Sequence, residues 1–375
     1  MSPSPNRRII IPLCSLLTVA LLFGSLPAIA ADVPATSPGR LDRVDTSVNR
    51  AVAYLLSEQD KDGAIVDEDK RMNNNNPMTA LALMAMASVG HQPADQSPEG
   101  TAMRRAINYL LVPDNQGRDR EGYLGGRDGS RMYGHGICTL ALTEMLGMGV
   151  NKDQDRQIRE RCQKAVELIL RSQRVKKYDA RFEGGWRYTP ESGDSDLSIT
   201  VWQVMALRSA NNAGLRVPKE AIDFAVSYLR RSYDSPRDTT GRPTNLRSGC
   251  AYQPGQSPRY ATAAAGLLAL QVCGQYDVPE VIGSAEWLRA LKVNYDEKWF
   301  FYGTYYYSQG MQKRGGDFAD VARQNTERIL LATQTADGSW TGTDGQERGA
   351  GRVYCTALAI LSLSVKYHFL PIYQH

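Results

Sequence analysis

The stretch ERILLATQTADGSWTGTDGQERGAGRVYCTALAILSLSV, from Glu327 to Val365, decides the fold of this chain. Its first part predicts an amphipathic helix that ends near Thr333 and is followed by a Gln-x-x-x-Gly-x-Trp turn. After a polar loop, a second helix from about Val353 to Val365 is apolar or small on nearly every side. A helix with one apolar stripe lies at a surface, whereas a helix that is apolar all round is surrounded by protein. The stretch therefore predicts an outer helix paired with an inner helix.

The same outer–inner unit recurs six times along the 375 residues. Four more inner helices, and a fifth that is less regular, are expected at 78–90, 136–149, 197–210, 260–274 and near 305–311. Successive copies begin about 45 to 60 residues apart, a spacing typical of two-helix repeats. Repeated hairpins of this kind form a closed ring or a stacked array. We therefore expect one all-α domain over residues 41–375, with about twelve helices in two concentric layers.

The first thirty residues do not belong to the repeats. Arg7 and Arg8 precede an Ile- and Leu-rich stretch, and an Ala-x-Ala cleavage pattern stands at 28–30. We expect residues 1–30 to be a cleaved export signal, with a retained membrane anchor as the alternative, and residues 31–40 to be a flexible lead. The mature protein is then expected to be periplasmic or extracellular. No later segment approaches the roughly 20 apolar residues of a membrane span.

Composition narrows the partners. Removing residues 1–30 leaves 42 basic and 40 acidic residues, and this near-neutral balance argues against nucleic acid. Six Cys and four His are too few for a disulfide or metal scaffold, and no phosphate-binding Gly-x-x-x-x-Gly-Lys-[Ser/Thr] motif occurs. We expect no cofactor and no metal. Cys138, Cys273 and Cys355 fall inside apolar helices, where buried inert thiols are expected.

Loop lengths predict a binding face. The connections that lead from an outer to an inner helix are mostly long, and in a ring of hairpins these loops share one face, which is often the binding face. The inner helices begin there, and each helix N-terminus carries about half a positive charge. Arg131, Arg187, Arg259 and Arg352 also lie near it, which favours an anionic ligand group at the mouth. The alternative is that Asp, Asn and Ser side chains of the loops already cap these helices.

The repeats resemble a known family. The Gln-x-x-x-Gly-x-Trp turn at 334–340, and GGWRY at 184–188 followed by DSDLSITVWQVMAL at 194–207, are similar to the repeats of squalene cyclases and protein prenyltransferase β-subunits. The resemblance covers nearly all of residues 42–373 and implies an (α/α)6 toroid. Because the same toroid also carries thioester domains and polysaccharide-active enzymes, the fold does not fix the function.

The resemblance to squalene cyclases implies acid-initiated chemistry. Those enzymes protonate an alkene with a buried carboxylic acid of an Asp-x-Asp-Asp motif, whose pKa is raised by burial and a like charge. Asp194-Ser195-Asp196 matches three positions and Leu197 stands at the fourth, so the resemblance implies Asp194 and Asp196 as the catalytic acids. The alternative is that both merely cap the helix that follows. The resemblance also implies aromatic side chains that stabilise a carbocation, with core packing as the alternative: Trp186, Tyr188, Trp202, Tyr305, Tyr306 and Tyr307.

The resemblance to prenyltransferases implies zinc held by Asp, Cys and His. Asp194 and Asp196 occupy the Asp-x-Cys region without its Cys, while His135 and Cys138 echo a His-x-x-Cys stretch. One His and two acids make a poor thiolate zinc site, so no metal is expected. His135, Arg131, Arg259 and Arg352 remain candidate ligand-binding residues, and the alternative for His135 is a hydrogen-bonded residue at a helix start.

Three functions from different classes remain open. The first is an exported cyclase-like protein that binds an isoprenoid or another apolar or anionic ligand, with chemistry at Asp194 and Asp196. The second is a non-catalytic envelope protein that binds a protein partner through its loop face. The third is a polysaccharide-active enzyme. A deep aromatic cavity favours the first, a filled barrel with an apolar loop face the second, and an open groove with two carboxylates about 5–10 Å apart the third.

Overall fold

The computed structural model of the chain describes residues 42–70, 74–112, 122–126, 128–367 and 369–374. The expected signal at 1–30 and lead at 31–40 lie outside these residues.

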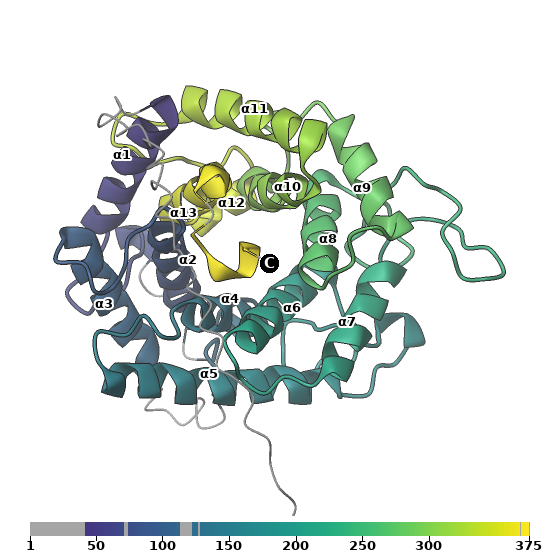
Figure 1. The fold of residues 1–375 in the computed structure, drawn as a ribbon, viewed down its shortest axis with the longest axis horizontal. Coiled ribbons are helices and arrows are strands. Elements are labelled where there is room, and N and C mark those ends of the chain that lie inside the picture. Colours follow the sequence, from purple (N-terminus) through teal and green to yellow (C-terminus); the bar gives the residue numbers. More distant parts are fainter. Residues whose placement is uncertain (1–41, 71–73, 113–121, 127, 368, 375) are drawn as a thin grey trace, which may run out of the picture. The chain divides into compact units, whose positions relative to one another are not determined.

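Two concentric layers of helices make up the described chain (Figure 1). The outer layer consists of α1 (Arg43–Ser57), α3 (Pro98–Leu111), α5 (Lys152–Gln173), α7 (Lys219–Arg231), α9 (Pro279–Arg289) and α11 (Gly316–Thr333). The inner layer consists of α2 (Asn75–Ser88), α4 (Arg131–Glu144), α6 (Leu197–Asn212), α8 (Tyr260–Val272), α10 (Phe300–Arg314) and α13 (Arg352–Leu363). A short helix, α12 (Gly345–Ala350), lies in the last long loop. Strand pairing in the described residues is limited to isolated bridges. The predicted all-α toroid is confirmed.

The burial pattern explains the two layers. On α2 every residue from Asn76 to Ser88 is buried, and α8 is buried along almost its whole length. On α7, by contrast, only one stripe is buried, which contains Ala225 and Leu229. A helix that is apolar on all sides must be enclosed by protein, which places it inside the ring. Among the helices of the described chain, none is both long and apolar enough to cross a membrane.

Contacts between the first and last hairpins close the ring. α13 packs against α2, and α11 packs against α1. Asp67, in the loop before α2, accepts backbone N–H bonds from Arg352 (3.0 Å) and Val353 (3.1 Å), the first two residues of α13. Lys366 Nζ also lies 2.5 Å from Asp45 on α1. These bonds join residues about 300 positions apart, so closure is a tertiary property that no local motif encodes.

Three glutamines, each at the end of an outer helix or just after it, connect neighbouring hairpins by hydrogen bonds. Gln334 Nε2 donates to the carbonyl of Gly338 in its own turn (2.8 Å) and to the carbonyl of Ser47 on α1 (2.9 Å). Two further glutamines make the same pair of bonds, one to its own turn and one to the next outer helix: Gln173 to Gly184 and Ala221, and Gln59 to Gly63 and Ala102. The predicted turn is therefore a joint between repeats.

The glycine of this joint needs its special conformation. Gly338 has φ +92°, which favours glycine, and a Cβ there would overlap the backbone carbonyl of Arg50 on α1. Trp340 follows, is fully buried, and donates from Nε1 to the carbonyl of Leu330 (2.9 Å). The turn can thus press its backbone directly against the neighbouring outer helix.

The C-terminal segment lies in the centre of the inner ring (Figure 1). It ends in a 3-10 helix, η4 (Pro371–Tyr373), and the Ile372 side chain is buried. Ile372 N–H donates to Glu144 Oε2 (3.1 Å), and Ser209 Oγ donates to Glu144 Oε1 (2.5 Å). Because Glu144 is the last residue of α4, η4 occupies the ring at the ends of the inner helices. Burial raises the pKa of Glu144 to about 7.

All five cysteines in the described residues carry free thiols. Cys138 and Cys355 are buried on inner helices, whereas Cys273, just after α8, is partly exposed. Burial raises the thiol pKa of all three.

Candidate functional site

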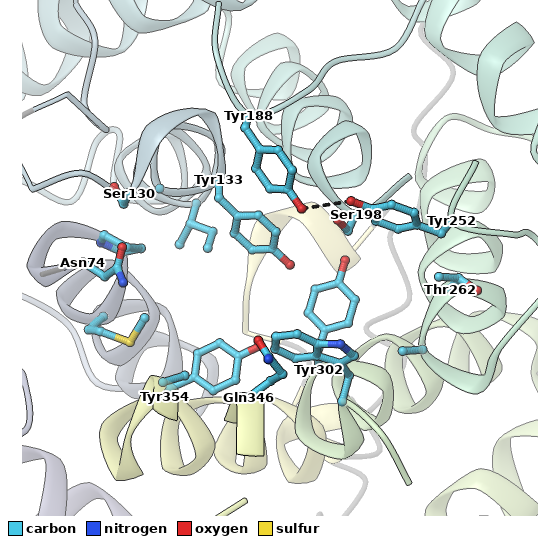
Figure 2. A pocket seen from close by; sticks show the side chains of 17 residues that line it. Asn74, Ser130, Tyr133, Tyr188, Ser198, Tyr252, Thr262, Tyr302, Gln346 and Tyr354 are labelled. Atoms are coloured by element: carbon cyan, nitrogen blue, oxygen red, sulfur yellow. Dashed lines mark hydrogen bonds between the residues drawn. The ribbon is translucent and has the colours of Figure 1, made fainter. Parts of the chain in front are cut away.

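A cavity of about 470 Å³ opens at the end of the ring where the inner helices begin. Its volume falls in the range of about 300–1,000 Å³ that is typical of small-molecule sites. Figure 2 shows the cavity from close by, with side chains that reach it from several inner helices. The residues that line it are Asn74, Pro77, Met78, Ser130, Tyr133, Gly134, Ile137, Tyr188, Ser198, Tyr252, Ala261, Thr262, Trp299, Tyr302, Gln346, Ala350 and Tyr354.

The first turn of each inner helix forms the wall. The third residue of five of the six inner helices lines the cavity: Pro77 on α2, Tyr133 on α4, Thr262 on α8, Tyr302 on α10 and Tyr354 on α13. On α6 the second residue, Ser198, takes this place. The repeat thus presents one side chain from each hairpin to a common centre.

Among the described residues the lining carries no charge, since none of the 17 is Asp, Glu, Lys, Arg or His. Five are tyrosines: Tyr133, Tyr188, Tyr252, Tyr302 and Tyr354. In Figure 2 the hydroxyls of Tyr133 and Tyr302 point toward the middle of the cavity, and Tyr188 and Tyr252 share a hydrogen bond at its edge (2.9 Å). The arrangement suits an uncharged ligand with apolar surface.

Asp196 lies behind this wall. It is fully buried and is the N-cap of α6, where Oδ1 accepts from Ile199 N–H (2.9 Å) and Ser198 Oγ (2.7 Å). Its Oδ2 accepts from Arg187 NH1 and from the hydroxyl of Tyr252, each at 3.1 Å. Burial raises the pKa of Asp196, while these four donors oppose the rise. Both oxygens are therefore occupied, and the carboxyl reaches the cavity only through Tyr252.

Asp194 is closer to solvent, with 23% of its side chain exposed. Its Oδ2 lies 3.4 Å from Arg187 Nε, so the two acids share one guanidinium. That guanidinium also lies over the rings of Tyr188 (4.8 Å) and Tyr252 (5.6 Å). The predicted acid pair thus forms an ion-pair and cation–π cluster that supports two tyrosines of the cavity wall.

The predicted aromatic residues separate into three places. Tyr188 lines the cavity. Trp202 lies one helical turn beyond Ser198 on α6, is buried, and stacks on Tyr305 with 5.9 Å between ring centroids. Tyr306 packs edge-on against Trp202 at 5.6 Å. Trp186 lies away from the cavity, where its Nε1 donates to the carbonyl of Ile169 (2.8 Å) as part of the glutamine joint.

His135 is buried, connects α4 to the preceding loop and to α5, and does not line the cavity. Leu124 N–H donates to Nδ1 (3.2 Å), so Nε2 carries the proton that binds the carbonyl of Ala165 on α5 (3.1 Å). This fixes the neutral tautomer, and burial lowers the pKa of His135 to about 3. In three other repeats a threonine accepts the corresponding loop N–H bond: Thr79, Thr200 and Thr356.

None of the three predicted arginines lines the cavity. Arg131 begins α4 and Arg259 precedes α8, and both are exposed. Arg352 forms an ion pair with Asp337 and lies 4.8 Å from the ring of Tyr54. The structure thus places these charges around the toroid, away from the cavity lining.

Carboxylates from the loops cap four of the six inner helices. Glu347 is buried and accepts from the N–H groups of Phe301 (3.1 Å) and Tyr302 (2.9 Å) at the start of α10. Corresponding caps, given as acceptor and N–H donor, are Asp128 to Asn76 on α2, Asp196 to Ile199 on α6 and Asp67 to Val353 on α13. Where ionised, these carboxylates offset the dipoles of the four helices that they cap, so those four N-termini provide less attraction for an anionic ligand.

Much of the lining was missed by sequence reasoning. Tyr133, Tyr302 and Tyr354 stand in first turns whose polar and aromatic residues interrupt the apolar pattern, and Trp299 is the N-cap that precedes α10. Aligning the first turns of the inner helices across the repeats would have indicated these positions, because the third residue lines the cavity in five of the six helices. In the described chain, no group of three or more His, Cys, Asp or Glu residues is placed to hold a metal ion.

No protein-family model and no curated relative matches the sequence. Solved structures do share the fold. The α-1,6-mannanase GH76A of Salegentibacter sp. HEL1_6 aligns over 88% of this chain and 100% of its own, with 9% identity and a TM-score of 0.59. The type II terpene cyclase MstE from Scytonema aligns over 88% of this chain and 100% of its own, with 15% identity and a TM-score of 0.55. At these identities the likeness establishes the α/α toroid, which a terpene cyclase and a mannanase share.

Two complexes indicate what such toroids hold. A variant of MstE with one aspartate replaced by asparagine has been solved with the substrate geranylgeranyl dihydroxybenzoate; that structure aligns over 88% of this chain, with 15% identity and a TM-score of 0.54. A mannanase variant, inactive after replacement of two consecutive aspartates, has been solved with α-1,6-mannotriose; it aligns over 87% of this chain, with 11% identity and a TM-score of 0.58.

Proposed function

We propose that this protein binds an isoprenoid or a similarly apolar, uncharged ligand in the cavity at the start of the inner helices. The observation that carries the proposal is the lining, which combines five tyrosines and a tryptophan with Met78, Ile137 and Pro77 and, among the described residues, has no charged side chain. Burying apolar ligand surface there contributes about 25 cal/mol per Å². An anion would lose its water without gaining a cationic partner, which costs several kcal/mol.

The polysaccharide alternative has less support. Glycoside hydrolysis commonly uses two carboxylates that flank the scissile bond. Among the described residues no carboxylate lines this cavity. The buried Asp196 is bonded to the wall residue Tyr252, and the buried Glu347 accepts from the backbone N–H of the wall residue Tyr302. A sugar could still bind to the aromatic rings and hydroxyl groups of this cavity, so an oligosaccharide is included among the test ligands.

Acid-initiated turnover at Asp194 and Asp196 is the second candidate, and Asp196 favours it by its burial and by its contact with the wall residue Tyr252. We propose instead that Asp196 positions Tyr252 and caps α6. Incubation with farnesol, geranylgeraniol and squalene, followed by product analysis, tests this. A cyclised product that the parent forms and Asp196→Asn does not would establish a catalytic role for Asp196 and overturn the positioning role that we propose.

Binding is tested by titrating farnesol and mannotriose into the protein and into a cavity-filled variant. Ala261 lines the cavity, so Ala261→Trp should abolish farnesol binding. Ala53 is exposed on the outer helix α1, so Ala53→Trp is the matched control and should bind as the parent does. Calorimetry that gives saturable farnesol binding only for the parent and the control supports the proposal. Saturable binding of mannotriose alone would move the function to carbohydrates.

We also propose that residues 1–30 direct export and that the mature chain works in the periplasm or outside the cell. N-terminal sequencing of protein from the native host should begin at Ala31. A mature chain that retains Arg7 and Arg8 would instead indicate an anchored protein. A protein partner at the loop face, the remaining alternative, would be indicated by co-purification that Ala261→Trp leaves unchanged.

A further inference from the structure

Three buried polar groups at or behind the cavity wall form no hydrogen bond of normal geometry within the described chain. Tyr302, which lines the cavity, is 4% exposed, and Tyr306 and Trp202 behind it are 0% and 1% exposed. Their phenol hydroxyls and indole N–H approach one another and Tyr133 only in imperfect contacts. Most buried polar groups in proteins are well paired, and leaving one unpaired costs about 1–3 kcal/mol. A ligand atom that reached this cluster would therefore improve its hydrogen bonding.

The groups lie together, and the cluster reaches the cavity. Tyr306 lies one turn beyond Tyr302 on α10, with 4.7 Å between ring centroids, and Trp202 lies 5.6 Å from Tyr306 and 6.5 Å from Tyr302. Tyr302 lines the cavity, and its hydroxyl points inward beside that of Tyr133 (Figure 2). Burial raises the pKa of the Tyr133 phenol, and hydrogen-bond contacts from Tyr302 and Trp202 oppose the rise.

Tyr302, Tyr306 and Trp202 together supply three hydrogen-bond donors but only two acceptor oxygens, those of the two phenols. An indole N–H can only donate, and each phenol brings one O–H donor. The lining around Tyr302 and Tyr133 offers no carboxylate to receive these hydrogens. The complement of such a cluster is an oxygen acceptor, and a carbonyl oxygen has two lone pairs that can receive two donors at once.

We propose that the hydroxyls of Tyr302 and Tyr133, backed by Tyr306 and Trp202, bind a neutral oxygen at the leading end of the ligand. The inference rests on the proposed function and narrows it to oxygenated isoprenoid-like molecules, such as aldehydes, ketones and alcohols, over plain hydrocarbons. We expect the oxygen to be uncharged because, among the described residues, no cation lines the cavity to stabilise a carboxylate or a diphosphate.

A matched ligand pair tests this. Farnesal, the aldehyde, and farnesene, the hydrocarbon of the same chain length, are titrated into the parent protein and into Tyr302→Phe and Tyr133→Phe. One net hydrogen bond is worth about 1 kcal/mol, so the parent should bind farnesal about fivefold more tightly than farnesene for each bond formed. Each variant should reduce that ratio by about fivefold, through weaker farnesal binding with farnesene binding unchanged or tighter.

The control is Tyr228→Phe, which removes a phenol hydroxyl that is equally buried but lies on the outer helix α7, away from the cavity. It should leave the ratio as in the parent, and thermal unfolding identifies any variant that has lost its fold. If Tyr302→Phe does not fold, Tyr133→Phe decides. Equal binding of both ligands by the parent, or a ratio that neither variant changes, overturns the inference but leaves the proposed function intact. Binding of neither ligand instead refutes the proposed function.

Discussion

Glu144 should make the protein less stable as pH rises from acid to neutral. The carboxyl is 2% exposed, and its buried partners are the hydroxyl of Ser209 and the backbone N–H of Ile372 in η4. Burial raises its pKa from an ordinary value of 4.5 to about 7. Because the native state holds the proton more tightly than the unfolded chain, the stabilisation is full below pH 4.5 and is lost as pH rises through 7.

The magnitude follows from the raised pKa. Between pH 5.5 and pH 7 the unfolded carboxyl is ionised while the native one is protonated, and each pH unit costs about 1.36 kcal/mol. Above pH 7 both are ionised and the effect levels off. Raising the pH from 5.5 to 8 should therefore lower the free energy of unfolding by about 2 kcal/mol through this one group.

The substitution that tests this is Glu144→Gln, which keeps the shape of the side chain and removes its titratable carboxyl group. The amide oxygen can still accept from Ile372, and the amide N–H₂ can donate to Ser209 Oγ. The gain in unfolding free energy of the variant over the parent should be larger at pH 8 than at pH 5.5 by about 2 kcal/mol. Because the comparison is made at each pH, groups that titrate in both proteins, such as Glu347 and His135, cancel.

Urea unfolding followed by tryptophan fluorescence measures this, provided that the denaturant dependence is the same in parent and variant. Glu160→Gln on the exposed face of α5 is the matched control and should change by less than about 0.5 kcal/mol between the two pH values. A difference of less than about 0.5 kcal/mol for Glu144→Gln, or a larger gain at pH 5.5, would refute the buried-carboxyl reasoning.

Three further substitutions test the joints and the acid cluster. Gly338→Ala should lower the free energy of unfolding by about 2–3 kcal/mol, because Gly338 has φ +92° and lies against the backbone of α1. Gly345→Ala should not, because no atom lies near the added carbon. Equal midpoints of the two variants in thermal unfolding would contradict this. Asp196→Asn should lower the free energy of unfolding in urea by about 1–3 kcal/mol because it weakens charged hydrogen bonds. Asp194→Asn should change it by less than about 0.5 kcal/mol. A larger loss for Asp194→Asn than for Asp196→Asn would refute the structural role that we assign to Asp196. His135→Ala should lower stability by about 2–4 kcal/mol and leave farnesol affinity unchanged, and a calorimetric loss of affinity without loss of stability would return this histidine to the ligand site.

The sequence was most informative where burial is continuous and least informative at the cavity. The starts expected for α6 at 197 and α8 at 260 agree with the structure because their first turns are already apolar or small. α4 begins at Arg131, five residues before the expected start, and α10 begins at Phe300. Their first turns contain polar and aromatic residues that face the cavity, so the apolar pattern fails there.

The acid pair shows a second limit. The motif placed Asp194 and Asp196 at the start of an inner helix, where the structure has them. Which groups surround the Asp196 carboxyl depends on Tyr252, 56 positions away in the next long loop. A local pattern carries no information about such a partner. The cap of α13 by Asp67, across 286 positions, was inaccessible for the same reason.

In the described part of the chain, η4 occupies the centre of the ring at the end opposite the mouth of the cavity. Tyr305 and Tyr373 join their hydroxyls behind the cavity, and Ile372 is held by Glu144 at the far end of the ring. The proposed ligand would then enter and leave by the mouth of the cavity, and a chain longer than the cavity would leave its tail outside.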